Sequence, residues 1–310
     1  MIARFSLIAV LGGACLAAES QIEGPKLGYI YDRQAAVIRP ILGIPGSALF
    51  GEPLSSELRE ALVSPSQDFA IGVFGDDSAV VILNFAGAKL RPLEGARPAP
   101  TRIVISPNGT SAAIVSGIHV QLFSGLPGNA TAGAEFDLAA EAAALAVSDD
   151  GELVLAAIAE SDIAALYSYS KSGAAHRILA AGKIRSIEFL NRSHDAVFAD
   201  ELENKIVLLR GGADASLVAS IDAPTAVAAS LDNRKIFVAS SASQTITSLS
   251  LEDGTSVSTA CGCEPVTLAR LQGGAAFRIT DRSDGPAWIY DTGGAEPRIL
   301  FIPQAGVGNE

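Results

Sequence analysis

Hydrophobic and polar positions along this chain follow one block that returns six times. In each copy a short apolar run ends at a polar turn, and a second apolar run follows the turn. The turns are anchored at residues that lie 40 to 42 positions apart, namely Ser64, Ser106, Ser148, Leu190, Ser230 and Leu271. Short apolar runs bounded by turn residues predict β-strands. Each copy therefore predicts a β-hairpin.

The third copy predicts how one unit folds. Its apolar runs 144–148 and 153–157 flank the turn 149–151, and two more polar strands are expected at 164–169 and 176–179. Asp-Gly and Asn-Gly pairs supply the positive φ angles that tight hairpins need. The first two strands are made of small apolar residues, as expected for strands covered on both faces. A period of about 40–45 residues with four strands per unit predicts an all-β β-propeller with repeats of about 42 residues. A large β-sandwich would not explain so regular a spacing.

The N-terminal segment bears on how the ring closes. Residues 29–32 and 39–45 resemble residues 288–291 and 298–303 of the last unit, with an Asp and an Arg seven positions apart in both. This likeness predicts seven copies of the outer half of a blade and six of the inner half. The length of the chain favours seven blades, and a six-bladed ring sealed by this segment is the alternative.

The longest irregular stretch runs from Gly43 to Glu60 and contains Leu49 and Phe50. An inserted loop that exposes these two side chains would suit a partner-binding edge. Closure of the ring explains the same residues, and this is our expectation.

Two of the turns carry a resemblance to a known group of proteins. Ser-Pro-Asn-Gly at 106–109 and Ser-Asp-Asp-Gly at 148–151 resemble the Ser-Pro-Asp-Gly turn of bacterial secreted β-propellers of the YVTN, lactonase-like and WD40-like types. The resemblance covers residues 62–303 as a repeat pattern and implies the propeller fold. It implies no particular activity, because propellers carry unrelated functions on a common scaffold. The Trp-Asp dipeptides of true WD40 repeats are absent, since the only Trp is Trp288.

The first 18 residues differ from the rest of the chain. One basic residue precedes the apolar run 5–11, and small residues follow up to Ala18. This order predicts a secretory signal peptide that is cleaved after Ala17 or Ala18; a lipoprotein anchored through Cys15 is the alternative. We therefore expect an exported protein, periplasmic or extracellular. The expected organisation is a signal peptide (1–18), an N-terminal linker (19–27), a β-propeller (28–303) and a C-terminal tail (304–310).

Composition narrows the possible partners. The net charge of −12 would repel a phosphate backbone, so no nucleic-acid partner is expected. After the first 18 residues no apolar stretch reaches the ~18 residues of a membrane span, and we expect a monomer. If Cys15 leaves with the signal peptide, Cys261 and Cys263 remain. Their spacing favours a disulfide in an oxidising compartment over free thiols.

Ligands of propellers usually bind at one mouth of the central channel, beside the residues that lead into the inner strands. Charged residues at these positions are our candidate ligand-binding residues: Arg59, Arg102, Glu141, Arg185 and Glu264. The arginines would make forked contacts with a carboxylate or another anion. The alternative is that these are solvated loop charges, or pairs that close the channel.

The sequence offers no clear catalytic constellation. The histidines fall in different units and at different points of the blade (His119, His176, His194), and Asp149 and Asp150 belong to a hairpin turn. No nucleophile elbow or phosphate-binding glycine loop occurs. We therefore expect no catalytic residue, metal or cofactor, and predict a non-catalytic scaffold that binds a protein or a small ligand. A propeller hydrolase, lactonase or lyase with a site at the channel mouth is the alternative.

Overall fold

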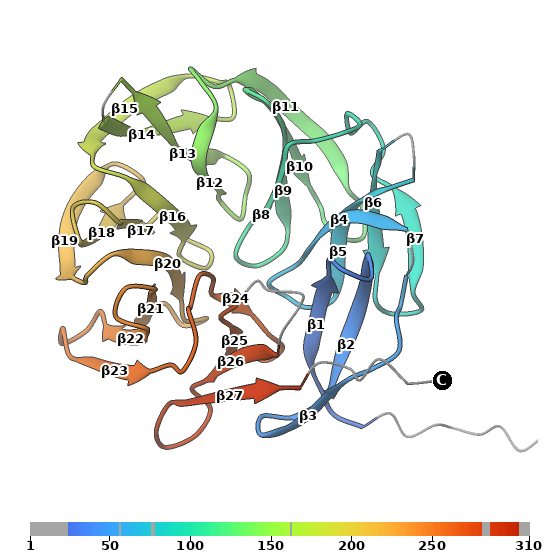
Figure 1. The fold of residues 1–310 in the computed structure, drawn as a ribbon. Coiled ribbons are helices and arrows are strands. Elements are labelled where there is room, and N and C mark those ends of the chain that lie inside the picture. The colour runs from blue at the N-terminus through green and yellow to red at the C-terminus, as the bar shows by residue number, and fades with distance from the viewer. Residues whose placement is uncertain (1–23, 56, 76–77, 162, 281–285, 304–310) are drawn as a thin grey trace, which may run out of the picture.

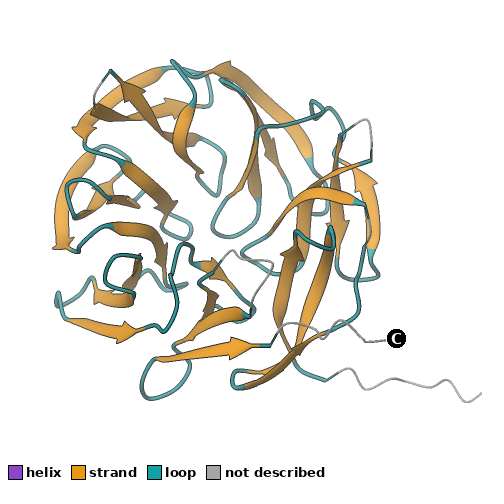
Figure 2. Ribbon diagram, viewed as in Figure 1, coloured by secondary structure: helices purple, strands orange, loops and turns teal. Residues whose placement is uncertain are grey.

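Seven antiparallel sheets surround a central axis (Figure 1). The computed structural model describes residues 24–303 except 56, 76–77, 162 and 281–285. Within these residues the chain forms strands, loops and turns and no α-helix (Figure 2). Six sheets have four strands and the first has three, so the prediction of a seven-bladed β-propeller is confirmed.

The strands follow chain order within every sheet, and we number the blades from the N-terminus. Blade 1 is β1 (Lys26–Asp32), β2 (Val37–Ile44) and β3 (Ser47–Phe50). Blade 2 is β4 (Leu58–Val63), β5 (Phe69–Phe74), β6 (Ala79–Asn84) and β7 (Lys89–Pro92). Blade 3 is β8 (Arg102–Ile105), β9 (Ser111–Ser116), β10 (His119–Ser124) and β11 (Thr131–Asp137). Blade 4 is β12 (Ala142–Val147), β13 (Leu153–Glu160), β14 (Ile163–Ser170) and β15 (Ala175–Ala181).

The C-terminal half repeats the same plan. Blade 5 is β16 (Ile184–Phe189), β17 (Ala196–Asp200), β18 (Lys205–Arg210) and β19 (Asp214–Ser220). Blade 6 is β20 (Pro224–Ala229), β21 (Lys235–Ser240), β22 (Thr245–Ser250) and β23 (Ser256–Ala260). Blade 7 is β24 (Ala269–Arg270), β25 (Ala276–Arg278), β26 (Ala287–Asp291) and β27 (Arg298–Ile302).

The hydrophobic core lies between the blades. Each of seven buried clusters joins two neighbouring sheets, and together they run around the whole ring. One cluster packs Leu27 and Ile41 of blade 1 against Ala276 and Ile289 of blade 7. Because both faces of a blade are covered, its middle strands read as continuous apolar runs. The ring is therefore closed by packing between the first and last blades.

A buried serine explains why the same turn recurs. The Ser148 hydroxyl donates to Asp150 Oδ1 at 2.6 Å and accepts the backbone N–H of Leu153 at 3.0 Å. Ser106 makes the equivalent contacts with Asn108 and Ser111. Each hydroxyl thus satisfies backbone and side-chain groups where the inner strand turns back, which is what a buried polar group requires.

Blade 1 corrects the prediction for the N-terminal segment. Residues 29–32 belong to β1, which is the innermost strand of its sheet, whereas 288–291 lie in β26, the third strand of blade 7. The shared spacing has a physical basis: Arg39 pairs with Asp32 at 3.2 Å and Arg298 with Asp291 at 2.6 Å. An Asp–Arg pair of this spacing indicates a hairpin, but it does not determine how far that hairpin lies from the central axis. The prediction that residues 29–32 belong to an outer hairpin was therefore wrong.

The irregular stretch after blade 1 contains its outer strand. Residues 47–50 form β3, in which Leu49 is 60% exposed and Phe50 packs against the cluster that joins blades 1 and 7. The described residues between β3 and β4 form no further strand. Closure of the ring therefore accounts for Phe50.

The predicted signal peptide, Cys15 and the C-terminal tail lie outside the described residues. The first strand begins at Lys26, inside the predicted linker. In the part of the chain that the structure describes, no helix has the length and apolar character to cross a membrane.

Candidate functional site

A cavity of about 330 Å³ lies on the axis of the ring, and we call it the channel cavity. Inner strands of six blades surround it: β1, β4, β8, β12, β16 and β24. Its walls are mainly apolar and include Leu62, Val104 and Leu145. Small inner-strand residues such as Ala61, Ala146 and Ala269 leave the space open. The inner strand of blade 6, β20, does not line this cavity.

Two charged residues cover the inner edge of β20. Glu188 on β16 and Arg270 on β24 form an ion pair of 3.1 Å between Oε1 and Nη2. The same Glu188 oxygen accepts the backbone N–H of Ala229 at 3.1 Å, and Arg270 Nη2 donates to the Ala229 carbonyl. The innermost strand of a blade leaves backbone groups unpaired along its inner edge. The ion pair satisfies both such groups of Ala229.

This pair is strongly desolvated. The Arg270 side chain is 5% exposed and that of Glu188 is 24% exposed, and both residues line the channel cavity. Burial raises the pKa of the Glu188 carboxyl, and the Arg270 charge and the Ala229 N–H offset only part of that rise. Arg270 Nε and Nη1 are buried and make no hydrogen bond with any described residue.

A second, smaller pocket of about 220 Å³ lies between blades 3 and 4, and we call it the mouth pocket. It contains two of the predicted ligand-binding residues, Arg102 at the start of β8 and Glu141 just before β12. Leu145 lines both this pocket and the channel cavity, so the two spaces adjoin. Of the five predicted residues, the structure thus places one arginine and one carboxylate, from neighbouring blades, in the same pocket.

Arg102 is half-buried, and burial lowers the pKa of its guanidinium. Among the described residues, neither Arg102 nor Glu141 forms a hydrogen bond or an ion pair through its side chain. Burial is the cause of this lower pKa, which agrees with the lack of an ion pair between Arg102 and the described residues. A partly desolvated cation without a partner is unfavourable unless a ligand supplies the opposite charge.

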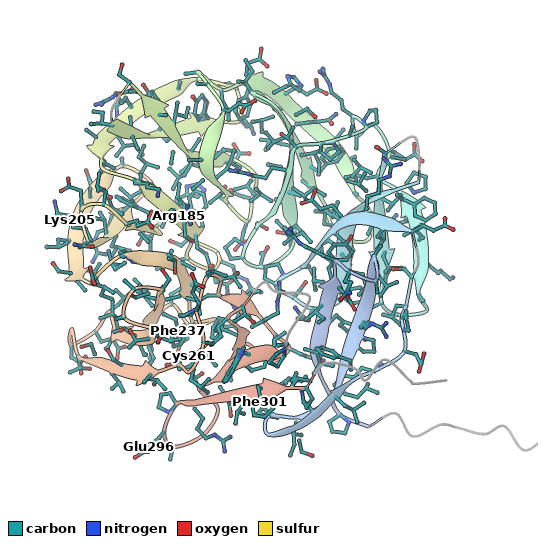
Figure 3. The ribbon with its side chains drawn as sticks, viewed as in Figure 1. Arg185, Lys205, Phe237, Cys261, Glu296 and Phe301 are labelled. Atoms are coloured by element: carbon teal, nitrogen blue, oxygen red, sulfur yellow. A yellow bond between two sulfur atoms is a disulfide. The ribbon has the colours of Figure 1, made fainter. Side chains whose placement is uncertain are left out.

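The other three predicted residues line neither space. Arg185 lies 3.6 Å from Glu201 of the same blade and is 48% exposed (Figure 3). Arg59 is exposed and donates to the Ser78 hydroxyl at 3.3 Å. Glu264 is exposed in the segment before β24. All five residues do precede or begin inner strands, but their side chains do not gather around one point.

Cys261 and Cys263 are joined by a disulfide in the segment between β23 and β24, with their Cα atoms 5.1 Å apart. Cys261 is buried in the cluster that joins blades 6 and 7, where Phe237 also lies (Figure 3). The bridge therefore belongs to the packing behind the channel wall.

The histidines lie apart from both spaces. His119 contacts Glu135 and Asp137 on the outer strand of blade 3, and His194 lies 2.9 Å from Asp150 at the turns of blades 4 and 5. His176 is exposed on β15. The described residues contain no group of three or more His, Cys, Asp or Glu side chains placed to hold a metal ion.

Glu188 and Arg270 were not among the predicted site residues, although the repeat contains a signal for them. When the six copies are aligned on their turns, Glu188 stands where the others have Leu62, Val104, Ala146, Ala228 and Ala269. Arg270 stands where they have Val63, Ile105, Val147, Phe189 and Ala229. A single charge at an otherwise apolar repeat position would have identified both residues.

Comparison with known proteins supports the fold. No protein-family model matches the chain, and no curated protein matches it by sequence. A functionally unknown protein from Desulfotomaculum acetoxidans is similar in structure, with a TM-score of 0.62 and 12% identity over 91% of this chain and 100% of its own. The β-propeller domain of Cps50 (Swd1) from Myceliophteria thermophila gives a TM-score of 0.56 and 13% identity over 81% and 88%. A chain of a nidogen/laminin complex gives 0.51 and 8% identity over 80% and 96%. At these identities the likeness shows the propeller fold alone.

Proposed function

We propose that this protein is a non-catalytic binding scaffold that holds a small ligand where the mouth pocket meets the channel cavity. The observation that carries the proposal is Arg102, a half-buried cation that has no side-chain partner among the described residues, in a chain of net charge −12. Arginines are almost never fully buried unless they are paired. A ligand with an acidic group would complete the missing pair.

The shape of the two spaces supports the same function. The polar mouth pocket adjoins the apolar channel cavity through Leu145. Binding sites for small molecules are commonly apolar cavities with a few polar groups that fix orientation. A ligand with a charged head and an apolar body would match both parts.

Glu188 supplies the argument for the alternative, a hydrolase, lactonase or lyase. A carboxyl whose pKa is raised by burial has the property of a general acid. In this chain its Oε1 atom is held by Arg270 and by the Ala229 N–H, so the same residue serves to cover β20. We therefore favour the binding function.

The proposal is tested by thermal unfolding of the full chain with a panel of small carboxylates, amino acids, dipeptides and monosaccharides. Binding to the folded state raises the midpoint. Arg102→Gln and Ala269→Leu should abolish the shift, the second because Leu fills the channel wall and Leu62 already occupies that repeat position. Arg185→Gln is the matched control, since Arg185 pairs with Glu201 outside both spaces.

Two results would contradict the proposal. One is a panel in which no compound shifts the midpoint, or in which every shift survives Arg102→Gln and Ala269→Leu. The other is hydrolysis of an ester or lactone panel that is lost in Glu188→Gln, which would favour the enzyme.

We also propose that the protein works outside the cytoplasm. The charge, apolar run and small residues of 1–18 support export, and a disulfide between Cys261 and Cys263 suits an oxidising compartment. The intact mass of the protein recovered from the periplasm or medium tests this. Cleavage after Ala17 or Ala18 with loss of two thiol hydrogens is expected, and an uncleaved cytoplasmic product would contradict it.

A further inference from the structure

The mouth pocket holds two opposite charges that do not pair with each other. Arg102 lies at the start of β8 and Glu141 just before β12, on neighbouring blades. Neither makes an ion pair or a hydrogen bond through its side chain with the residues that the structure describes. Glu141 is exposed and Arg102 is half-buried, so a ligand that enters from solvent can reach both charges.

The frame around these charges is fixed. The Thr101 hydroxyl donates to the Val115 carbonyl and accepts the Gly117 N–H, each at 3.1 Å, so the residue before Arg102 is tied to the β9–β10 turn. Gly117 has φ of +62°, and a Cβ there would lie 3.9 Å from Glu141 Oε1, with no other atom within 4 Å apart from those of the adjacent residues in the chain. The turn thus leaves open space beside the Glu141 carboxylate.

From this arrangement we infer that the ligand of the mouth pocket is a free α-amino acid with an apolar side chain. Its carboxylate would bind the Arg102 guanidinium and its ammonium group the Glu141 carboxylate. The inference rests on the proposed function and specifies its ligand. A simple carboxylate would leave Glu141 unused, and a simple amine would leave Arg102 unpaired.

The channel cavity determines the side chain of this ligand. Leu145 lines both the charged pocket and the adjoining space of about 330 Å³, whose walls also include Ile103 and Ile187. An apolar side chain that passes Leu145 would be buried against these residues and gain the free energy of leaving water. An acidic side chain would be desolvated there, and the Arg270 charge on the cavity wall is already paired with Glu188.

The test is calorimetric titration of the full chain with L-leucine, N-acetyl-L-leucine and L-leucinamide. The first analogue lacks the ammonium group and the second lacks the carboxylate. Each should bind about tenfold or more weakly than leucine, because a charge-assisted contact is lost. Aspartate, with its acidic side chain, should also bind more weakly than leucine.

Variants of the two side chains test which of them binds the carboxylate of the ligand and which binds its ammonium group. In Arg102→Gln the difference between leucine and leucinamide should disappear, and in Glu141→Gln the difference between leucine and N-acetyl-leucine should disappear. If these residues served only in folding, the variants would not change the ratio of the affinities for leucine and for each analogue. Arg185→Gln, the control outside the pocket, should leave all affinities unchanged.

The failures can be told apart. If leucine does not bind, or if both analogues bind as well as leucine, the assignment to an amino acid is wrong. The proposed function survives that result when another compound of the panel binds in a manner that depends on Arg102. It fails as well when no compound does.

Discussion

Glu188 and Arg270, 82 residues apart in the sequence, meet at 3.1 Å in front of a blade to which neither belongs. Between them lies Ala229 on β20: Glu188 accepts its backbone N–H, and Arg270 donates to its carbonyl. The Ser186 hydroxyl accepts the Val227 N–H at 3.3 Å on the same edge. Blades 5 and 7 are thus linked across the inner edge of blade 6.

Arg270→Val should destabilise the protein by about 3 kcal/mol, because it leaves the buried Glu188 carboxylate without its partner. Valine is a suitable replacement, since Val63 and Val147 occupy the same repeat position. The free energy of unfolding from urea titration measures the effect. The double variant Glu188→Ala/Arg270→Val should recover part of the loss, because it removes the stranded charge as well.

The control for this pair is Arg234→Ala. Arg234 lies 3.3 Å from Glu252, but both side chains are more than 60% exposed (66% and 63%). An exposed pair of this kind contributes about 0–1 kcal/mol. Equal losses in Arg234→Ala and Arg270→Val would argue against a special role for the buried pair.

The stability contributed by Glu188 should fall as the pH rises. Burial raises its pKa in the folded protein above the usual value of about 4.3, so the folded state holds this proton to higher pH than the unfolded chain. The free energy of unfolding therefore decreases between the unfolded and the folded pKa. Wild type should lose stability relative to Glu188→Gln on going from about pH 4 to about pH 7.

Comparison with this variant is needed because other carboxyls have the opposite dependence. Hydrogen bonds lower the pKa of Asp253 to about 2, and the bond from the Ser250 hydroxyl makes the largest contribution. Such groups lose their stabilising effect as the pH falls, and they do so equally in wild type and in Glu188→Gln. A constant difference between the two proteins across this range would contradict a raised pKa for Glu188.

The repeat was sufficient to predict the ring, because apolar inner strands return at a regular spacing and the same serine turn returns in four units, at Ser64, Ser106, Ser148 and Ser230. It was not sufficient to place the first hairpin. The Asp32–Arg39 spacing matches that of Asp291–Arg298, yet β1 lies at the axis and β26 does not. Local pairing fixes a hairpin, whereas its radial position depends on contacts with distant blades.

The candidate site was predictable only in part. The chain order located the residues that lead into inner strands, and Arg102 and Glu141 line one pocket because their blades are neighbours. The pattern could not predict the direction of each side chain: Arg185 lies beside Glu201, which follows β17 of the same blade. The Glu188–Arg270 pair spans two units, so no single copy of the repeat contains it.

Asp149 should contribute to the contact between three blades as well as to its own turn. Its carboxylate accepts the backbone N–H of Asn108 at 2.8 Å and that of Arg192 at 2.6 Å, on either side of blade 4. Asp149→Ala should lower the free energy of unfolding by about 1–2 kcal/mol, because two backbone donors lose their acceptor. Asp214→Ala, on the exposed strand β19, is the control and should change it by less than about 0.5 kcal/mol.

The Gln67 side chain should be the most sensitive single group at the closure of the ring. It lies in the turn after β4, where its Oε1 accepts the Tyr29 N–H at 2.6 Å and its Nε2 donates to the Arg270 carbonyl at 2.8 Å. One buried amide thus joins blades 1, 2 and 7. Gln67→Ala should cost about 2–4 kcal/mol, since two buried backbone groups lose their partners.

A matched control separates this effect from the backbone conformation. Gln67 has φ of +62° and Gln244 has φ of +52°, but Gln244 is exposed. Gln244→Ala therefore introduces the same residue at a similar backbone angle without removing a buried contact. Hydrogen exchange of the Tyr29 amide gives a local measurement: it should accelerate in Gln67→Ala and stay unchanged in Gln244→Ala. If both variants are equally stable and protect Tyr29 equally, the ring is held closed by the apolar contacts between blades 1 and 7 alone.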